Sequence, residues 1–187
     1  MVTIAALWLP ILLSAVLVWI ASAIAWTAAP HHKSDFRVIP NQDDVLDLVG
    51  SKNLTPGQYW FPNSSDRKDM AKPEMVAKME KGPVGVMTIM PNGRPNMGKA
   101  MALSFVFYLG VGIMVAYLAG RTIAAGAEYL AVFRVAGTVA FVAHVGALFP
   151  DSTWFGTPWK RTWKSVGDGF VYALLTGGAF GAFWPGM

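Results

Sequence analysis

Apolar residues gather in four long stretches of the chain, and a long polar segment separates the first stretch from the other three. The stretches cover residues 4–28, 100–120, 128–149 and 169–184. A helix needs about 20 predominantly apolar residues to cross the hydrocarbon core of a bilayer. Each stretch comes close to that length, so the pattern predicts four transmembrane helices.

The polar segment carries helix and strand signals of its own. Acidic residues that follow Asn41 predict a helix that Asn41 caps and Gly50 can end, and a second helix is predicted over residues 73–81. Aromatic and β-branched residues predict two short strands at 58–62 and 84–90, each closed by proline. These elements bury too little apolar surface for us to expect independent folding.

We therefore expect an all-α membrane protein, with four transmembrane helices and a small α+β extramembrane insert between helices one and two. The predicted division is a transmembrane helix at 1–29, an insert at 30–98 and a three-helix transmembrane unit at 99–187. Short connections should make the last three helices an antiparallel unit. The long insert should leave the first helix freer to pack elsewhere.

Composition agrees with a membrane protein: 54% of the residues are hydrophobic and only 14% are charged, against about 25% charged in ordinary globular domains. The net charge of +4 is spread over the polar segments rather than gathered in one block, so we expect no nucleic-acid partner. The absence of cysteine excludes disulfides, thiolate nucleophiles and cysteine-ligated clusters.

The basic residues near the helix ends predict an orientation. All but Arg121 fall on the side of the insert: Lys33, Arg37, Arg94, Lys99, Lys160, Arg161 and Lys164. By the positive-inside rule, the insert at 30–98 is then cytoplasmic and both termini are outside. We expect a multi-pass protein of the bacterial inner membrane.

Arg134 and His144 are ionisable residues inside the third apolar stretch, where polar groups are candidates for function. Arg134 is shallow enough to reach the interface, or to pair with a lipid phosphate or a partner carboxylate. His144 could meet Asp168 across the bundle. Our first interpretation of that pair is a structural hydrogen bond; the alternatives are a proton relay and axial ligation of a pigment or haem by His144.

We predict no catalytic residues and no metal site. Residues 93–100 have phosphate-loop spacing, but Ala replaces the Ser or Thr that would hold magnesium. His31 and His32 are adjacent and no third ligand follows at metal spacing, which favours an interfacial role. Met75 and Met79 lie one helical turn apart, as packing residues often do. We therefore do not expect an enzyme.

Small residues recur at four-residue spacing in the predicted transmembrane helices, and such rows let helix backbones approach closely. The clearest positions are Gly112, Gly120, Gly177 and Gly181. These rows can serve packing within one chain or contacts with neighbouring subunits.

Residues 32–36, 54–62, 81–85 and 129–134 resemble segments of a family of bacterial four-span integral membrane proteins. The resemblance covers most of the chain. It implies the four-span architecture, and it implies no activity, cofactor or site residue, because none is established for that family.

Taken together, these observations favour a non-catalytic accessory or scaffolding subunit of a larger bacterial membrane complex, with respiratory and photosynthetic electron-transfer assemblies as hosts by analogy. The expected partners are other integral membrane subunits and membrane lipids. The alternatives are a small transporter or proton-conducting protein, and a pigment- or haem-binding module. A lipid is the ligand we expect first.

Overall fold

The computed structural model describes residues 1–186, which form two compact units. Unit 1 comprises residues 1–35, 96–152 and 157–186, and unit 2 comprises residues 36–95 and 153–156. The polar insert is therefore a unit of its own, whereas the first helix belongs to the same unit as the helices that follow the insert.

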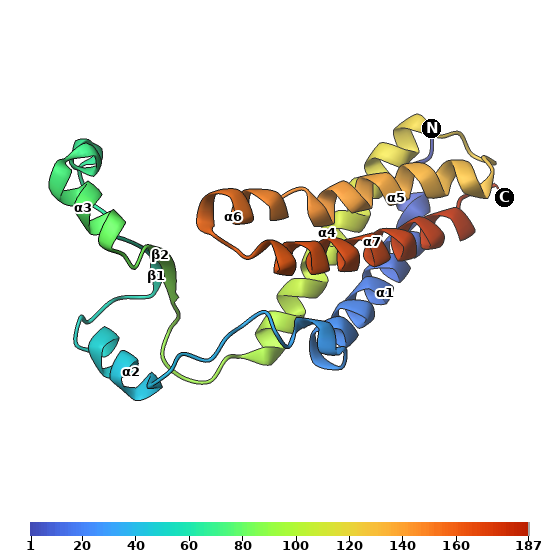
Figure 1. Ribbon diagram of the computed structural model, residues 1–187. Coiled ribbons are helices and arrows are strands. Elements are labelled where there is room, and N and C mark those ends of the chain that lie inside the picture. Colours follow the sequence, from blue (N-terminus) through green and yellow to red (C-terminus); the bar gives the residue numbers. More distant parts are fainter. Residues whose placement is uncertain (187) are drawn as a thin grey trace. The chain divides into compact units, whose positions relative to one another are not determined.

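Four long helices of unit 1 pack side by side (Figure 1). The helices of this part of the chain are α1 (Trp8–Thr27), α4 (Met97–Thr122), α5 (Tyr129–Val145), α6 (Leu148–Phe155) and α7 (Trp159–Ala182). Helix α1 contacts α4 and α7, and α5 contacts the same two helices. The four long helices thus close a ring around a common core.

Three helical segments are long and apolar enough to cross a membrane: Ala5–Thr27, Met97–Thr122 and Tyr129–Phe155. They confirm three of the four expected spans and the assignment as a membrane protein. The fourth expected span, 169–184, overlaps the second part of α7 and extends two residues beyond its end, and the fourth crossing is not confirmed. The first part of α7 is polar, with Lys160, Lys164 and Asp168, and only its second part is apolar.

The core of unit 1 is built from small and β-branched residues. Val115, Ala116, Ala136 and Ala140 are buried on the inner faces of α4 and α5. Small side chains let these helices approach one another closely, and close packing is what holds helices together in an apolar environment.

Trp184, which follows α7, lies inside unit 1. It is only 2% exposed and belongs to the core cluster. Its indole Nε1 donates a hydrogen bond to the backbone carbonyl oxygen of Ala124 at 2.8 Å. This residue therefore fastens the end of α7 to the α4–α5 connection.

Gly112 and Gly120 form the contact between α4 and the N-terminal part of the chain. A Cβ at Gly112 would lie 3.2 Å from the carbonyl oxygen of Ile11, and one at Gly120 would lie 2.5 Å from that of Val2. The two glycines are thus engaged inside the chain.

Gly177 and Gly181 form the equivalent contact between α7 and α5. A Cβ at Gly177 would lie 3.0 Å from the carbonyl oxygen of Phe133, and one at Gly181 would lie 2.7 Å from the ring of Tyr129. All four glycines predicted as interaction positions therefore serve packing within unit 1.

Helix α1 is held in this unit by contacts along its length. The indole Nε1 of Trp19 donates to the carbonyl oxygen of Met101 at 3.0 Å, and Leu7 and Ile11 belong to the core cluster. The length of the insert therefore does not separate the first helix from the others, because side-chain packing decides its position.

Both ends of unit 1 lie at the α4–α5 connection (Figure 1). The amide of Val2 donates to the carbonyl oxygen of Gly120 at 2.9 Å, and the amide of Gly126 donates to that of Pro185 at 2.9 Å. Residues before α1 are thus hydrogen-bonded to the end of α4, and residues after α7 to the connection that follows α4.

Unit 2 contains the helices and strands that the sequence predicts. They are α2 (Gln42–Gly50), β1 (Gly57–Phe61), α3 (Pro73–Lys81) and β2 (Gly85–Ile89), with a 3-10 turn at Arg67–Ala71. The strands pair antiparallel, with Gly57 opposite Ile89 and Phe61 opposite Gly85. Asn41 precedes α2 in a left-handed conformation, but its side chain makes no capping hydrogen bond.

Unit 2 has no buried core. None of residues 36–95, all of which the structure describes, is buried, and exposed apolar side chains such as Leu46, Leu48 and Trp60 remain on its elements. A two-stranded sheet with two short helices is too small to exclude water by itself. The tertiary contacts of the chain are therefore concentrated in unit 1.

Candidate functional site: a histidine–aspartate cluster at the start of α7

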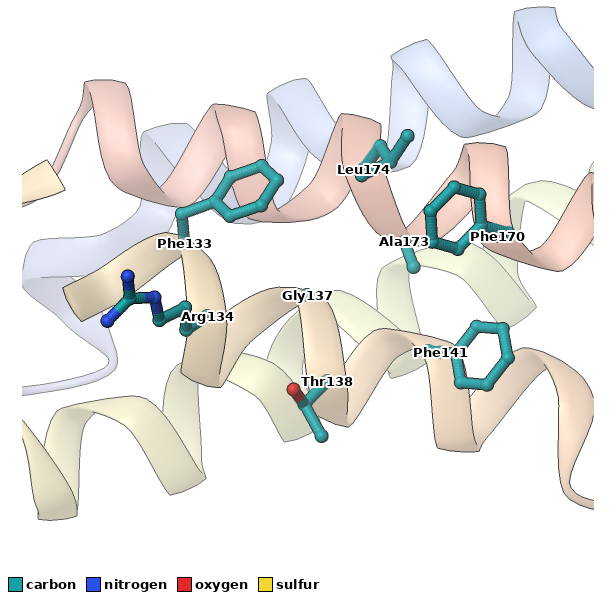
Figure 2. A pocket seen from close by; sticks show the side chains of 8 residues that line it. All are labelled: Phe133, Arg134, Gly137, Thr138, Phe141, Phe170, Ala173 and Leu174. Atoms are coloured by element: carbon teal, nitrogen blue, oxygen red, sulfur yellow. The ribbon is translucent and has the colours of Figure 1, made fainter. Parts of the chain in front are cut away.

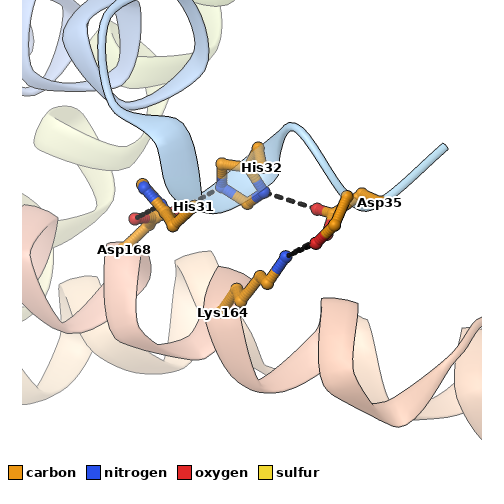
Figure 3. A network of polar contacts seen from close by, with 6 residues as sticks. His31, His32, Asp35, Lys164 and Asp168 are labelled. Atoms are coloured by element: carbon orange, nitrogen blue, oxygen red, sulfur yellow. Dashed lines mark hydrogen bonds and ion pairs between the residues drawn. The ribbon is translucent and has the colours of Figure 1, made fainter.

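A cluster of ionisable side chains joins the segment after α1 to helix α7 (Figure 3). The short 3-10 helix Pro30–His32 follows α1 and presents two adjacent histidines. Lys164 and Asp168, one helical turn apart on α7, face this segment. Asp35 completes the cluster.

His32 lies at the centre of the cluster. Its Nε2 is 2.6 Å from Oδ2 of Asp168, and its Nδ1 is 2.6 Å from Oδ2 of Asp35. The His32 side chain is only 4% exposed. Each ring nitrogen of His32 therefore has a carboxylate oxygen as its hydrogen-bond partner.

His31 occupies the other oxygen of Asp168. Its Nε2 is 3.0 Å from Oδ1 of Asp168, and its side chain is 36% exposed. Asp168 therefore meets one histidine on each carboxylate oxygen. The cluster is buried on the His32 side and open to its surroundings on the His31 side.

Asp35 is bound by two groups at once. Nζ of Lys164 is 2.5 Å from its Oδ1, and Lys164 also donates to Oγ of Ser34 at 2.9 Å. Burial by itself raises the pKa of the Asp35 carboxyl, but hydrogen bonds from Lys164 and His32, together with their positive charges, hold that pKa below its ordinary value. Asp35 is thus a fixed anion beside His32.

Trp26 covers one face of His32. The two rings are parallel, with an interplanar angle of 1° and centroids 4.0 Å apart. The indole thus covers the imidazole face and helps to fix the orientation of the His32 ring between its two carboxylate partners.

The cluster combines two chemical capabilities. In the first, it is a closed ion-pair network of two carboxylates, two histidines and a lysine. In the second, one nitrogen from each histidine and a carboxylate oxygen of Asp168 lie within 4.8 Å of one another, as metal ligands do. Imidazole and carboxylate together suit first-row divalent transition metals.

Sequence reasoning missed this cluster because Asp168 lies 136 residues after His32. A search for a third ligand near the histidines finds none, and no periodicity links residue 32 to residue 168. The sequence singled out Asp168 as a candidate residue, but with His144 as its expected partner.

His144 does not pair with Asp168 as expected. Both oxygens of Asp168 contact His31 and His32, whereas the His144 ring lies among aromatic rings. Its centroid is 5.5 Å from that of Tyr172 and 5.9 Å from that of Tyr108. The proposed His144–Asp168 hydrogen bond was wrong because the carboxylate faces α1 rather than α5.

Arg134 lies beside an apolar groove between α5 and α7 (Figure 2). The groove has a volume of about 350 Å³, and the rings of Phe133, Phe141 and Phe170 contribute to its lining. The Arg134 side chain is exposed. Within residues 1–186, it forms no ion pair.

Comparison of the chain with protein families, with curated proteins and with solved structures finds no match. The function must therefore be argued from the geometry of the chain itself.

Proposed function

We propose that the chain is a four-span membrane protein that serves as a non-catalytic accessory or scaffolding subunit of a larger bacterial membrane complex. The observation that carries this proposal is Arg134, an exposed cation on a membrane-spanning helix beside an apolar groove. Ionisable residues in such helices usually pair or reach an aqueous interface.

The groove and the charge together suggest the chemistry of the neighbour. An apolar groove fits an apolar side chain of an adjacent transmembrane helix, and the guanidinium beside it fits a carboxylate on that helix. The small-residue rows do not contribute to this contact, because Gly112, Gly120, Gly177 and Gly181 are already engaged within the chain.

A comparison of two arginine variants tests this proposal. We expect the natural protein, extracted from its own membranes in mild detergent, to migrate in a stoichiometric complex with other membrane proteins. Arg134→Gln should shift the chain to the free form, because the neighbour then loses its cationic partner. Arg121→Gln is the matched control: Arg121 is also exposed, at the end of α4, but lies away from the groove.

Three results would overturn the proposal. The first is a natural protein that migrates as a monomer at native abundance. The second is an Arg134→Gln variant that remains in the complex to the same extent as the control. The third is occupation of the groove by an anionic lipid alone, detected by native mass spectrometry, with no protein partner.

The fourth crossing is supported by the position of the chain ends. Three crossings would leave Phe155 on the side opposite Val2. Pro185, however, is hydrogen-bonded to Gly126 just after α4, and Val2 is hydrogen-bonded to Gly120 near the end of α4. These bonds support a return of α7 through the thickness of the bundle. Its Lys164 and Asp168 meet protein partners rather than lipid, which reduces the cost of polar residues there.

Cysteine labelling tests the four spans and the orientation together, because the chain has no natural cysteine. Single cysteines are introduced at Ser65, at Ala125 and after Met187. With four spans, the last two label with a membrane-impermeant maleimide from the same side and Ser65 labels from the other. By the positive-inside rule, Ser65 is the cytoplasmic position. Labelling of the chain end from the side of Ser65 would exclude the fourth span.

The two alternative functions have separate tests. Proton conduction is measured as flux into proteoliposomes, and an unchanged flux in His144→Ala rejects a relay through that residue. A pigment or haem on His144 requires a Soret or near-infrared absorption band in the protein purified with its native complex. Asp168 is bound to His31 and His32 and not to His144, so the geometry gives no support to a proton relay between His144 and Asp168.

A further inference from the structure

We propose that His31, His32 and Asp168 form a binding site for one divalent transition-metal ion, with Zn²⁺ as its probe. The three side chains come from two distant parts of the chain and converge on one point (Figure 3). This site is independent of Arg134 and of any host complex.

The donor set suits such an ion. Two imidazoles and one carboxylate are a recurrent protein ligand set for zinc, with water in the remaining position. The donor atoms already lie close together: Nε2 of His31 is 3.0 Å from Oδ1 of Asp168, and Nε2 of His32 is 2.6 Å from Oδ2. Zinc bonds of about 2.0–2.2 Å in a tetrahedron separate neighbouring ligand atoms by roughly 3.3 Å. Each of these two nitrogen–oxygen pairs would therefore need to move apart by less than roughly 1 Å. The three donor atoms lie within 4.8 Å of one another and would have to gather around one ion.

Asp35 holds the ring nitrogen of His32 that faces away from the proposed ion, as a carboxylate usually does behind a metal-binding histidine. Its Oδ2 is 2.6 Å from Nδ1 of His32, so Nδ1 can keep its proton while Nε2 presents a lone pair to the ion. Asp35 is itself fixed by Lys164 at 2.5 Å, and its side chain is 2% exposed. Asp35 is thus a positioning residue for His32.

The metal would replace two existing hydrogen bonds with coordination bonds. His32 Nε2 would lose its proton to solvent as the ion binds, and His31 would bind in the tautomer that leaves Nε2 free. The charge of the ion is partly balanced by Asp168 in the first shell and by Asp35 behind His32. Lys164 remains on Asp35 and does not touch the three ligands in the structure.

The effect of the ion would be a cross-link between the end of α1 and α7. His31 and His32 directly follow α1, and Asp168 lies on α7. The exposed side of His31 gives the ion access from outside the bundle. Binding of the ion would therefore stabilise the folded chain.

The test uses the full chain in detergent micelles, with any polyhistidine tag removed. Zn²⁺ alone is titrated against a chromophoric chelator, and we expect one ion per chain. His31→Ala should weaken binding at least tenfold, and Asp168→Asn should do the same. His31→Ala is the sharper variant because His31 is the more exposed histidine, and its removal leaves the His32–Asp35–Lys164 contacts in place.

His144→Gln is the matched control, since it removes the third histidine of the chain without touching the cluster. Circular dichroism of each metal-free variant establishes that it is folded. Zn²⁺ should raise the Tm of the natural chain and of His144→Gln, and should leave the Tm of His31→Ala unchanged.

Asp35 is tested by rescue. Asp35→Ala should weaken Zn²⁺ binding by about 10–100-fold. Asp35→Asn should recover most of the affinity, because its amide oxygen can still accept a hydrogen bond from Nδ1–H of His32. The absorption spectrum of bound Co²⁺ reports the geometry of the ligands, so it should change in Asp35→Ala more than in Asp35→Asn.

Equal Zn²⁺ affinity in the natural chain and in His31→Ala would overturn the proposal. So would binding of several weak ions per chain, or the absence of any binding to the natural chain under conditions where it is folded.

Discussion

Nε2 of His32 lies 2.6 Å from Oδ2 of Asp168, although 136 residues separate the two in the sequence. This contact joins the segment after the first membrane-spanning helix to the last helix of the same unit. Asp168 therefore contacts the pair His31 and His32, and it does not contact His144 as the sequence suggested. The stability of unit 1 should therefore depend on this carboxylate.

Asp168→Asn should lower the free energy of unfolding by on the order of 3 kcal/mol, because the buried His32 ring then loses one of its two carboxylate partners. The side chains of His32 and Asp168 are 4% and 16% exposed. Thermal unfolding in detergent, followed by circular dichroism without added metal, measures the change. Asp151→Asn is the control, because Asp151 is an exposed acid on α6. Equal Tm values for the two variants would contradict the prediction.

Lys164→Ala should destabilise the chain by about 2 kcal/mol, since Asp35 would keep only one of its two partners. Lys160→Ala, on the exposed side of the same helix, should be nearly neutral. The double variant with Asp35→Asn measures the coupling directly, and we expect a coupling free energy of roughly 0.5–3 kcal/mol. Additive effects of the two single substitutions would show that the ion pair contributes nothing.

Two glycines of α4 should respond oppositely to alanine. At Gly120, the new Cβ would lie 2.5 Å from the carbonyl oxygen of Val2, whereas at Gly110 no atom lies within 4 Å. Gly120→Ala should therefore cost about 1–3 kcal/mol. Gly110→Ala should be neutral or stabilising by up to about 1 kcal/mol, because alanine favours a helix. Thermal unfolding measures the stability of both variants. A larger loss of stability in Gly110→Ala than in Gly120→Ala would refute the packing argument.

Limited proteolysis should cut the insert before the helices of unit 1. None of residues 36–95 is buried, and segments with few buried contacts open at low free-energy cost. With trypsin, we expect early cleavage after basic residues of the insert such as Lys52 and Lys81, and late cleavage after Lys164, whose Nζ is bound to Asp35. Mass spectrometry of the fragments over time measures the order. An insert as resistant as α7 would indicate that another surface protects it.

The sequence by itself determined the features that depend on local pattern. Apolar stretches of sufficient length identify three membrane-spanning helices, and proline, glycine and aromatic residues mark the helices and strands of the insert. These signals are local. A helix forms its backbone hydrogen bonds between residues a few positions apart, and the apolar residues that identify a membrane-spanning helix lie within one continuous segment of the sequence.

Tertiary structure alone decided which residues meet. Packing places α1 against α4 and α7 despite the long insert, buries Trp184, and directs Asp168 toward His31 and His32 instead of His144. Such contacts depend on the rotation and register of whole helices, which small residues such as Gly120 and Gly181 set by allowing close approach. No local pattern encodes that rotation, so the partners of Asp168 appear only when the helices are packed together.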